Sequence, residues 1–250
     1  MYQALPALAS LSPLPPGSPL DEKIARARLV LDALLTVPGL PPEQTVVAFT
    51  GGKDSTIALH LWRAALSACG CGPLRAVSID TGFKFPEVAA FRDELADKWG
   101  VELILARPGV SLDGYPVGVD RLACCRDLKI APLGAALRGM GAHALITGIR
   151  RDENPARRNL PYAEQRPETE LMPAHWQVNP LLDWTELDVW AFITGQGLPY
   201  CPLYHQGYRS LSCMPCTALA GGEHGDGCER CGRDADKERQ METLRSLGYF

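Results

Sequence analysis

The sequence lacks the features that would assign it to several specialised classes of protein. No apolar run approaches the roughly 20 residues that a membrane-spanning helix requires. The N-terminus does not have the basic and then apolar layout of a secretory signal peptide. Aromatic residues make up only 7% of the 250 residues, beside 46% hydrophobic and 22% charged residues. These values exclude fibrous and disordered chains and favour a globular protein, which we expect in the cytoplasm, without a membrane partner.

The sequence also has no excess of positive charge. It contains 25 Lys and Arg against 29 Asp and Glu, which gives a formal net charge of −4. Such a chain has no general electrostatic field for a polyanion, so nucleic acid is not an expected partner. A small anionic ligand would need a local cluster of basic groups.

Cysteine, in contrast, is abundant. The nine cysteines are an odd number in a chain without an export signal. This argues against a disulfide framework and in favour of metal binding or thiol chemistry.

From residue 45 onwards, continuous apolar strands alternate with amphipathic helices. Strands are predicted at 45–49, 75–79, 101–105 and 144–147, and helices at 55–67, 86–99, 128–138, 185–196 and 236–247. One further helix is predicted before the first strand, at 21–35. The pattern predicts an α/β fold, Rossmann-like, with a mostly parallel twisted sheet, helices on both faces and ligands at the carboxyl ends of the strands. We expect a poorly ordered, proline-rich arm at 1–20, a nucleotide-binding domain at 21–205, and a cysteine-rich tail at 206–250 packed on that domain.

A glycine-rich loop lies where the first strand turns into its helix. Its residues are Thr50, Gly51, Gly52, Lys53, Asp54, Ser55 and Thr56. The glycines let the backbone approach an anion, Ser55 and Thr56 open a helix with unpaired amides, and Lys53 adds a positive charge. This context predicts a phosphate-binding loop, although a tight turn with incidental polar residues would have the same composition.

The loop resembles the pyrophosphate loop, Ser-Gly-Gly-Lys-Asp-Ser, of the ATP-pyrophosphatase class, with Thr50 where serine is usual. Further segments, at 78–87, 147–158, 179–190 and 199–210, resemble the phosphoadenosine phosphosulfate (PAPS) reductase family and the small subunit of bacterial ATP sulfurylase. The resemblance extends from residue 45 to the C-terminus. It implies an adenine nucleotide alpha-hydrolase-like fold and an adenine nucleotide as ligand: adenylyl sulfate (APS), PAPS or ATP.

Polar residues after the second and fourth strands are candidates for binding this nucleotide. Asp80, followed by Thr81, could accept a hydrogen bond from a ribose or help to hold magnesium, or it could merely cap a turn. After Gly148, a basic cluster suits sulfate and phosphate oxygens, or it forms a solvated loop paired with Asp152 and Glu153. The arginines of this cluster are Arg150, Arg151, Arg157 and Arg158.

Four cysteines resemble the ligands of a [4Fe-4S] cluster in the iron–sulfur members of the family, chiefly APS reductases. They are the tandem pair Cys124 and Cys125 and the pair Cys213 and Cys216. Arg126 and Lys129 would offset the negative charge of such a cluster. A zinc ribbon is the alternative, because Cys213 and Cys216 are followed by a second Cys-x-x-Cys at Cys228 and Cys231. It would leave the tandem pair unexplained.

The tail decides between two kinds of enzyme. Reductases of this family carry a Glu-Cys-Gly-Leu/Ile-His segment whose cysteine attacks the sulfur of the sulfonucleotide, and this sequence does not contain it. The nucleophile would then be Cys228 or Cys231, on a glycine-rich segment able to swing, with the other thiol resolving the S-sulfonate. This hypothesis is an APS or PAPS reductase of sulfate assimilation, with a thioredoxin or glutaredoxin-like donor.

The alternative is an ATP-dependent adenylyltransferase or sulfurtransferase, like the ATP sulfurylase small subunit or DNA phosphorothioation enzymes. Lys53 and Ser55 are intact, whereas reductases commonly have a degraded loop. Lys53 and Mg²⁺ would then stabilise the leaving pyrophosphate. The sequence leaves homo-oligomerisation open.

Overall fold

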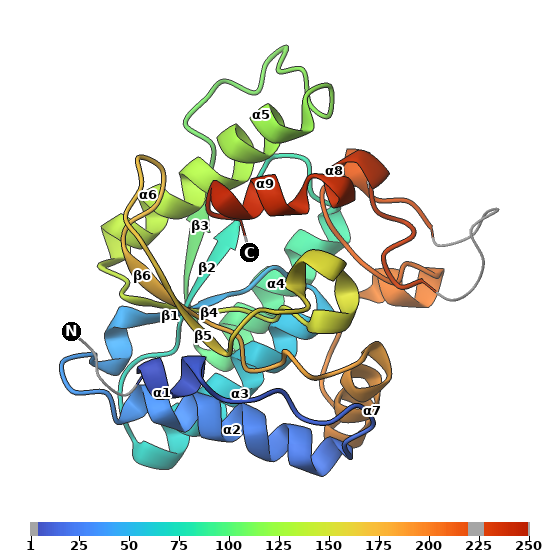
Figure 1. Cartoon of the computed structure of the whole chain (residues 1–250). Coiled ribbons are helices and arrows are strands. Elements are labelled where there is room, and N and C mark those ends of the chain that lie inside the picture. The colour runs from blue at the N-terminus through green and yellow to red at the C-terminus, as the bar shows by residue number, and fades with distance from the viewer. Residues whose placement is uncertain (1–4, 220–227, 250) are drawn as a thin grey trace.

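A six-stranded sheet forms the centre of the computed structural model, which describes residues 5–219 and 228–249. In spatial order its strands are β3 (Glu102–Ala106), β2 (Arg75–Ile79), β1 (Thr45–Ala48), β4 (Ala144–Ile146), β6 (His175–Val178) and β5 (Ala163–Arg166). All neighbours pair in parallel except β5, which runs antiparallel to β6. The predicted α/β fold with a mostly parallel sheet is therefore confirmed (Figure 1).

Helices cover both faces of this sheet because successive strand residues point to opposite sides. In β1, Val47 packs with one core cluster, whereas Val46 and Ala48 pack with the other. The first cluster contains residues of α1 (Leu5–Ala9), α2 (Leu20–Leu35), α3 (Lys53–Cys69), α4 (Pro86–Trp99) and α7 (Glu186–Gln196). The second contains residues of α5 (Arg121–Cys125), α6 (Ala131–Met140) and α9 (Met241–Ser246), and α8 (Ala235–Arg239) precedes α9 in the tail (Figure 1).

The order of the strands reverses beside β1. The chain moves from β1 to β2 and β3 on one side, and then crosses to β4 on the other side of β1. The loops that leave the carboxyl ends of β1 and β4 therefore diverge, and such a switch point is where open α/β sheets bind their ligands.

The N-terminal segment is partly regular. Residues Leu5–Ala9 form α1, which packs on β5, and the side chains of Leu5 and Leu8 are 0% and 4% exposed. The expectation of an arm without regular structure was wrong for this stretch, while residues 1–4 lie outside the described part. A proline in the first turn of a helix is tolerated because its missing N–H would have no partner there.

Other differences concern the extent of the elements. The sequence pattern missed β5 and β6, and α3 begins two residues earlier than expected, at Lys53. The helix expected at 128–138 is the end of a longer helical run in which α5 and α6 are joined by a π-helical turn at Arg126–Ile130. The last helix is divided into α8 and α9 at Gln240. None of the described helices is long and apolar enough to cross a membrane.

Candidate functional site

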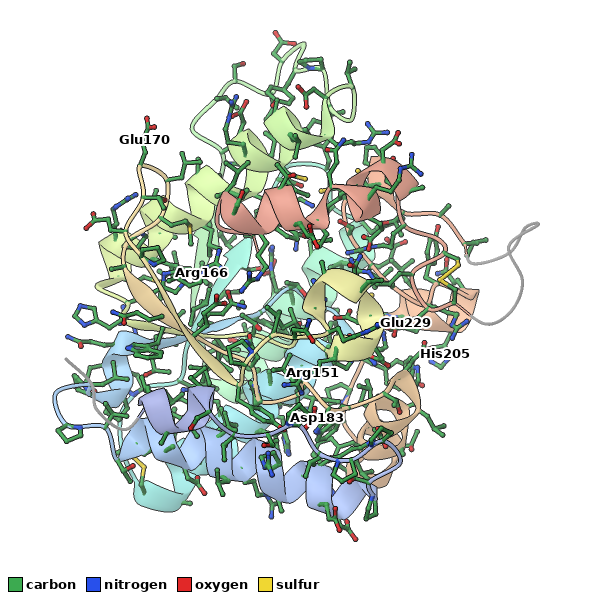
Figure 2. The ribbon with its side chains drawn as sticks, viewed as in Figure 1. Arg151, Arg166, Glu170, Asp183, His205 and Glu229 are labelled. Atoms are coloured by element: carbon green, nitrogen blue, oxygen red, sulfur yellow. A yellow bond between two sulfur atoms is a disulfide. The ribbon has the colours of Figure 1, made fainter. Side chains whose placement is uncertain are left out.

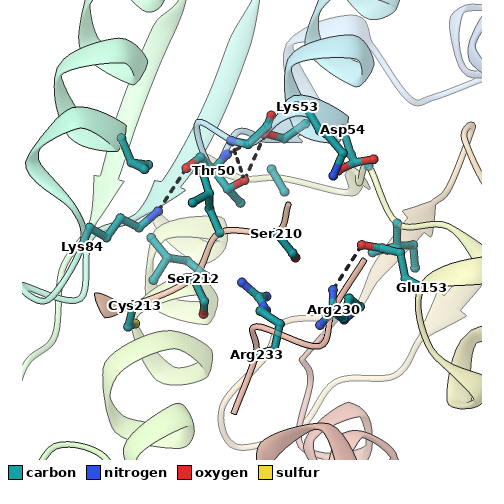
Figure 3. A pocket seen from close by; sticks show the side chains of 18 of the residues that line it. Thr50, Lys53, Asp54, Lys84, Glu153, Ser210, Ser212, Cys213, Arg230 and Arg233 are labelled. Atoms are coloured by element: carbon teal, nitrogen blue, oxygen red, sulfur yellow. Dashed lines mark hydrogen bonds and ion pairs between the residues drawn. The ribbon is translucent and has the colours of Figure 1, made fainter. Parts of the chain in front are cut away.

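A pocket lies at the switch point of the sheet, between the loop after β1, the loop after β4 and the C-terminal tail (Figure 3). The β1 loop contributes Thr50 and residues 52–55, and the β4 loop contributes Gly148 and Ile149. The tail closes the opposite side with residues 210–213, Arg230, Arg233 and Tyr249. The predicted phosphate loop is thus part of the wall of this pocket.

Local hydrogen bonds hold the phosphate loop in shape. The backbone N–H of Thr50 donates to Ser55 Oγ at 3.2 Å, and Ser55 Oγ donates to the carbonyl of Gly52 at 2.9 Å. Gly51 adopts a φ of +81°, and a Cβ at this position would lie 2.9 Å from a methyl group of Val88 on α4. A glycine is required there by both the backbone conformation and the close approach of α4.

Gly148 is required for a second close approach. A Cβ at Gly148 would lie 2.7 Å from the carbonyl carbon of Asp54 and 2.8 Å from the amide nitrogen of Ser55. The β4 loop therefore packs directly against the backbone of the phosphate loop. This glycine brings the two loops of the switch point together.

The ammonium group of Lys53 is buried at one edge of the pocket, where it is 1% exposed. It forms an ion pair with Glu229 of the tail, lies 3.4 Å from Asp54, and donates to the carbonyl of Arg209 at 3.0 Å. Burial alone would lower the pKa of Lys53, but the carboxylates of Asp54 and Glu229 raise it above its ordinary value. Lys53 is therefore charged and already neutralised by carboxylates.

The four arginines after β4 do not form the single anion site that the sequence predicted. Arg150 is fully buried and is neutralised by Asp54, Asp152 and Glu229. Arg151 points elsewhere, pairing with Asp183 and covering the ring of Tyr162 (Figure 2). Arg157 lines the pocket but is paired with Glu153, and Arg158 is exposed. The alternative interpretation, in which arginines of this loop pair with Asp152 and Glu153, applies to two of them. Arg150 pairs with Asp152, and Arg157 pairs with Glu153.

Other cations, which sequence reasoning did not assign to the nucleotide site, line the pocket instead. They are Lys84, Arg230 and Arg233, which are labelled in Figure 3, and Lys129. Lys84 donates to the carbonyl of Thr50 at 3.3 Å, Lys129 donates to Ser212 Oγ at 3.3 Å, and burial lowers the pKa of Lys84 to about 8. Arg230 pairs with Glu153 and Glu238, whereas Arg233 Nη1 is buried without a hydrogen-bond partner among the described residues.

Asp80 and Thr81 have different positions at the end of β2. Asp80 Oδ1 accepts a hydrogen bond from the N–H of Gly82 at 3.3 Å, and its carboxylate lies 3.6 Å from Arg107. This geometry is that of a turn cap, and Asp80 is outside the pocket wall. Thr81 is fully buried, lines the pocket, and lies 3.3 Å from the sulfur of Cys213.

The four cysteines predicted as cluster ligands are buried, and none of them forms a disulfide. Burial raises the pKa of Cys124, and the neighbouring sulfurs of Cys125, Cys213 and Cys216 raise it further. Burial alone would also raise the pKa of Cys213, but Lys129, a hydrogen bond from Thr81, Lys237 and Lys84 lower it to about 7. Lys129 therefore faces the thiols, whereas Arg126 is half-exposed and pairs with Asp127.

The tail cysteines Cys228 and Cys231 lie outside the pocket wall. Both are exposed and are joined in a disulfide, and the N–H of Cys231 donates to the carbonyl of Cys228 at 3.4 Å. The glycine-rich stretch before them, on which the swinging-tail hypothesis depends, falls at 220–227, outside the described residues. In the described conformation neither sulfur is a free thiol.

The fold and the pocket together define an α/β protein of the class that binds nucleotides at the switch point of a parallel sheet. A sequence model described as the phosphoadenosine phosphosulfate reductase domain matches residues 44–219. An adenosine 5'-phosphosulfate reductase of Agrobacterium fabrum is 34% identical over 84% of this chain and 84% of its own length. The chain therefore belongs to the phosphoadenosine phosphosulfate reductase family.

Further relatives represent both expected activities. A phosphoadenosine 5'-phosphosulfate reductase of Alkalilimnicola ehrlichii is 32% identical over 68% of this chain and 69% of its own length. A sulfate adenylyltransferase subunit 2 of Azospirillum brasilense is 33% identical over 78% of this chain and 71% of its own length. The fold is similar to that of a phosphoadenylyl-sulfate reductase from Candida auris, with a TM-score of 0.59 at 23% identity over 84% of this chain and 98% of that one.

Gly148→Ala should weaken binding of ADP, because the added methyl group must push the β4 loop away from the backbone of Asp54 and Ser55. We expect a loss of about tenfold or more, corresponding to about 1.4 kcal/mol, in isothermal titration calorimetry. Gly139→Ala, on α6 with open space around its Cβ, is the matched control and should bind ADP normally. Unchanged ADP affinity in Gly148→Ala would show that the two loops need not touch.

Proposed function

We propose that the protein is a sulfonucleotide reductase that binds APS or PAPS in the pocket and releases sulfite. The observation that carries the proposal is a group of three cations that line the pocket, Lys84, Lys129 and Arg233. Among the described residues, no carboxylate forms an ion pair with Lys84, Lys129 or Arg233. Lys129 is buried, and Lys84 and Arg233 are partly buried. Cations removed from water are costly unless an anion accompanies them, so these three favour a ligand with a compact negative group beyond the nucleotide.

A sulfonucleotide supplies that group. Its phosphate would lie against the amides at the start of α3, where helix N-termini favour anions. Its sulfate would lie against Lys84, Lys129 and Arg233, whose donors suit sulfate oxygens. A thiolate attacking the sulfur breaks the bond to the phosphate oxygen, the nucleoside phosphate leaves with the electron pair, and a second thiol then releases sulfite and forms a disulfide. The cations stabilise the charge on both groups during this transfer.

We also propose that Cys124, Cys125, Cys213 and Cys216 hold a [4Fe-4S] cluster. Four buried thiols without disulfides, beside the ammonium groups of Lys129 and Lys237, suit such a negatively charged group. When bound, it would fix the tail beside the pocket and add negative charge next to Lys129. The π-helical turn that follows Cys125 supports a functional role, because π turns concentrate at such sites.

The donor geometry favours this cluster over zinc. Zinc bonds of about 2.3 Å in a tetrahedral site keep sulfurs within about 4 Å of one another. Among the described residues, the one group of three or more candidate ligands within 4.8 Å consists of the carboxylates of Asp54, Glu153 and Glu229. The zinc-ribbon alternative would also need Cys228 and Cys231, which are paired with each other.

Cys228 and Cys231 are our candidates for the redox thiols of the reaction. Because they are exposed and outside the pocket wall, the tail has to move for either sulfur to meet a sulfonucleotide. Their pairing shows that the two sulfurs can reach each other. An S-sulfonate on one could therefore be resolved by the other, and a thioredoxin or glutaredoxin-like donor would then reduce the disulfide.

The second candidate function is an ATP-dependent adenylyltransferase. Lys53 and Ser55 of the pyrophosphate loop are intact, and Asp54 belongs to the carboxylate group that could hold Mg²⁺. The transfer of an adenylyl group has no use for the redox pair Cys228 and Cys231, so we rank this function second.

The two functions make different products. Anaerobically purified protein given APS or PAPS with thioredoxin should release sulfite, and this release should fall by about tenfold or more in Arg233→Ala, which removes a charge from the transition state. Arg158→Ala, an exposed arginine, should behave like the wild type. If the protein forms pyrophosphate from ATP and sulfate but releases no sulfite from APS or PAPS, the reductase proposal is refuted and the adenylyltransferase is supported.

Cys124→Ser should abolish bound iron and the broad visible absorbance of an iron–sulfur cluster, since the cluster loses one of its four ligands. Cys201→Ser is the control, because Cys201 is also a buried free thiol but lies in the other core cluster. Iron and sulfide analysis with absorbance spectra measures the difference. Colourless wild-type protein with stoichiometric zinc would refute the cluster.

Cys228→Ser and Cys231→Ser test the tail thiols in a single turnover, with every protein first reduced by dithiothreitol and then freed of it, and without added donor. One variant should accumulate an S-sulfonate on the remaining cysteine, detected by mass spectrometry, because the resolving thiol is missing. The other should not react. Cys69→Ser, an exposed cysteine far from the tail in sequence, should react as the wild type does. Undiminished sulfite release by both tail variants would eliminate these thiols from the mechanism.

A further inference from the structure

A carboxylate of the tail occupies the two cations beside the phosphate loop. One oxygen of Glu229 pairs with the ammonium group of Lys53, and the other pairs with the guanidinium group of Arg150. The side chains of Lys53, Arg150 and Glu229 are 1%, 0% and 9% exposed, so solvent anions have little access to them. A phosphate group bound at this place would also direct one oxygen to each of the two buried cations.

The carboxylates of this cluster outnumber its cations before any ligand enters. Asp54 lies 3.4 Å from Lys53 Nζ and 2.8 Å from Arg150 Nε, and Asp152 lies 2.9 Å from Arg150 Nη1. With Glu229, three carboxylates already face the two cations. A phosphate placed on Lys53 would add uncompensated negative charge to a buried site, which is strongly unfavourable. Full use of Lys53 by a nucleotide therefore requires Glu229 to withdraw.

The disulfide between Cys228 and Cys231 encloses Glu229. It closes a four-residue turn with a Cα to Cα distance of 5.3 Å. From this turn Glu229 reaches Lys53 and Arg150, while Arg230 reaches Glu153 and Glu238. A dithiol reductant supplies two electrons and two protons and converts the disulfide into two thiols. The opened turn has more conformations available to it, so it presents Glu229 less firmly.

We propose that Cys228 and Cys231 form a redox site that is coupled to the phosphate loop through Glu229. In the disulfide form Glu229 holds Lys53 and Arg150, and in the dithiol form it gives way to the phosphate groups of a nucleotide. The identity of the nucleotide rests on the proposed function. Because coupling between two sites is reciprocal, a nucleotide that displaces Glu229 also makes the disulfide easier to reduce.

This coupling gives the reaction a direction. A turnover that oxidises the two thiols returns Glu229 to Lys53, which displaces the product nucleotide. Reduction by the donor then releases Glu229 and readmits substrate. The tail thus acts as an internal competitor whose strength depends on the oxidation state of its own cysteines.

The test is the dissociation constant of ADP, which carries phosphates but no sulfur, measured anaerobically by calorimetry on oxidised and on dithiothreitol-reduced protein. A Cys69→Ser background removes the Cys69–Cys71 disulfide from the comparison. The oxidised protein should bind ADP more weakly by about fivefold or more. Adenosine, which has no phosphate to compete with Glu229, should bind both forms equally.

Glu229→Gln should bind ADP more tightly than the wild type and should lose the dependence on redox state, because an amide cannot neutralise Lys53. Glu242→Gln, an exposed carboxylate of the same tail, is the matched control and should retain the dependence. The midpoint potential of the disulfide in the wild type should rise with saturating ADP, by about 30 mV for each tenfold of coupling.

The outcomes separate the inference from the proposed function. Equal ADP affinity in the two redox forms of the wild type would overturn the coupling and leave the reductase proposal intact. Equal redox dependence in Glu229→Gln and in the wild type would also overturn it, since the effect would not pass through Glu229. No binding of ADP to any form would overturn the coupling, and sulfite release from APS or PAPS would still decide the reductase proposal on its own.

Discussion

Positive charge buried around one pocket is the constraint on which the rest of the structure depends. Lys53 and Arg150 are matched by carboxylates, whereas Lys84, Lys129 and Arg233 face the pocket without a carboxylate partner among the described residues. A cation that is removed from water without a counter-ion lowers the stability of the folded chain. An anion that fills the pocket therefore contributes to folding as well as to catalysis, and ligand binding and stability are linked.

The parallel part of the sheet could be predicted because its strands are short apolar runs between helices. β5 and β6 could not be predicted from such runs, because their sequences are largely polar. His175 and Gln177 are nevertheless buried, with hydrogen bonds to the carbonyl of Pro173 at 2.8 Å and to Asn179 Oδ1 at 3.1 Å. These polar side chains can be buried because the folded chain supplies hydrogen-bond partners. The local sequence pattern does not show those partners.

The same distinction applies to the site. The phosphate loop is contiguous in sequence and could be recognised. The grouping of the four cysteines rests on the family resemblance, and the structure shows that all four are buried and free of disulfides. The cations that line the pocket were not predicted. The arginines after the fourth strand are neighbours in sequence and suggest a basic cluster, whereas Lys84, Lys129 and Arg233 come from three separate segments. The sequence does not tell whether a lysine or arginine lines the pocket or pairs with a carboxylate elsewhere, as Arg151 does with Asp183. Only the position of the side chain in the folded chain distinguishes the two cases.

The short helix α1 also has a consequence for solubility. β5 is the last strand of the sheet, and an uncovered edge strand offers free backbone groups to which another chain can add. Helix α1 packs beside β5, with Leu5 and Leu8 buried, so this helix covers part of the edge strand. At the opposite edge β3 carries the exposed charge of Glu102, which opposes the same kind of pairing. The two edges of the sheet are thus protected against aggregation by different means, one by covering and one by charge.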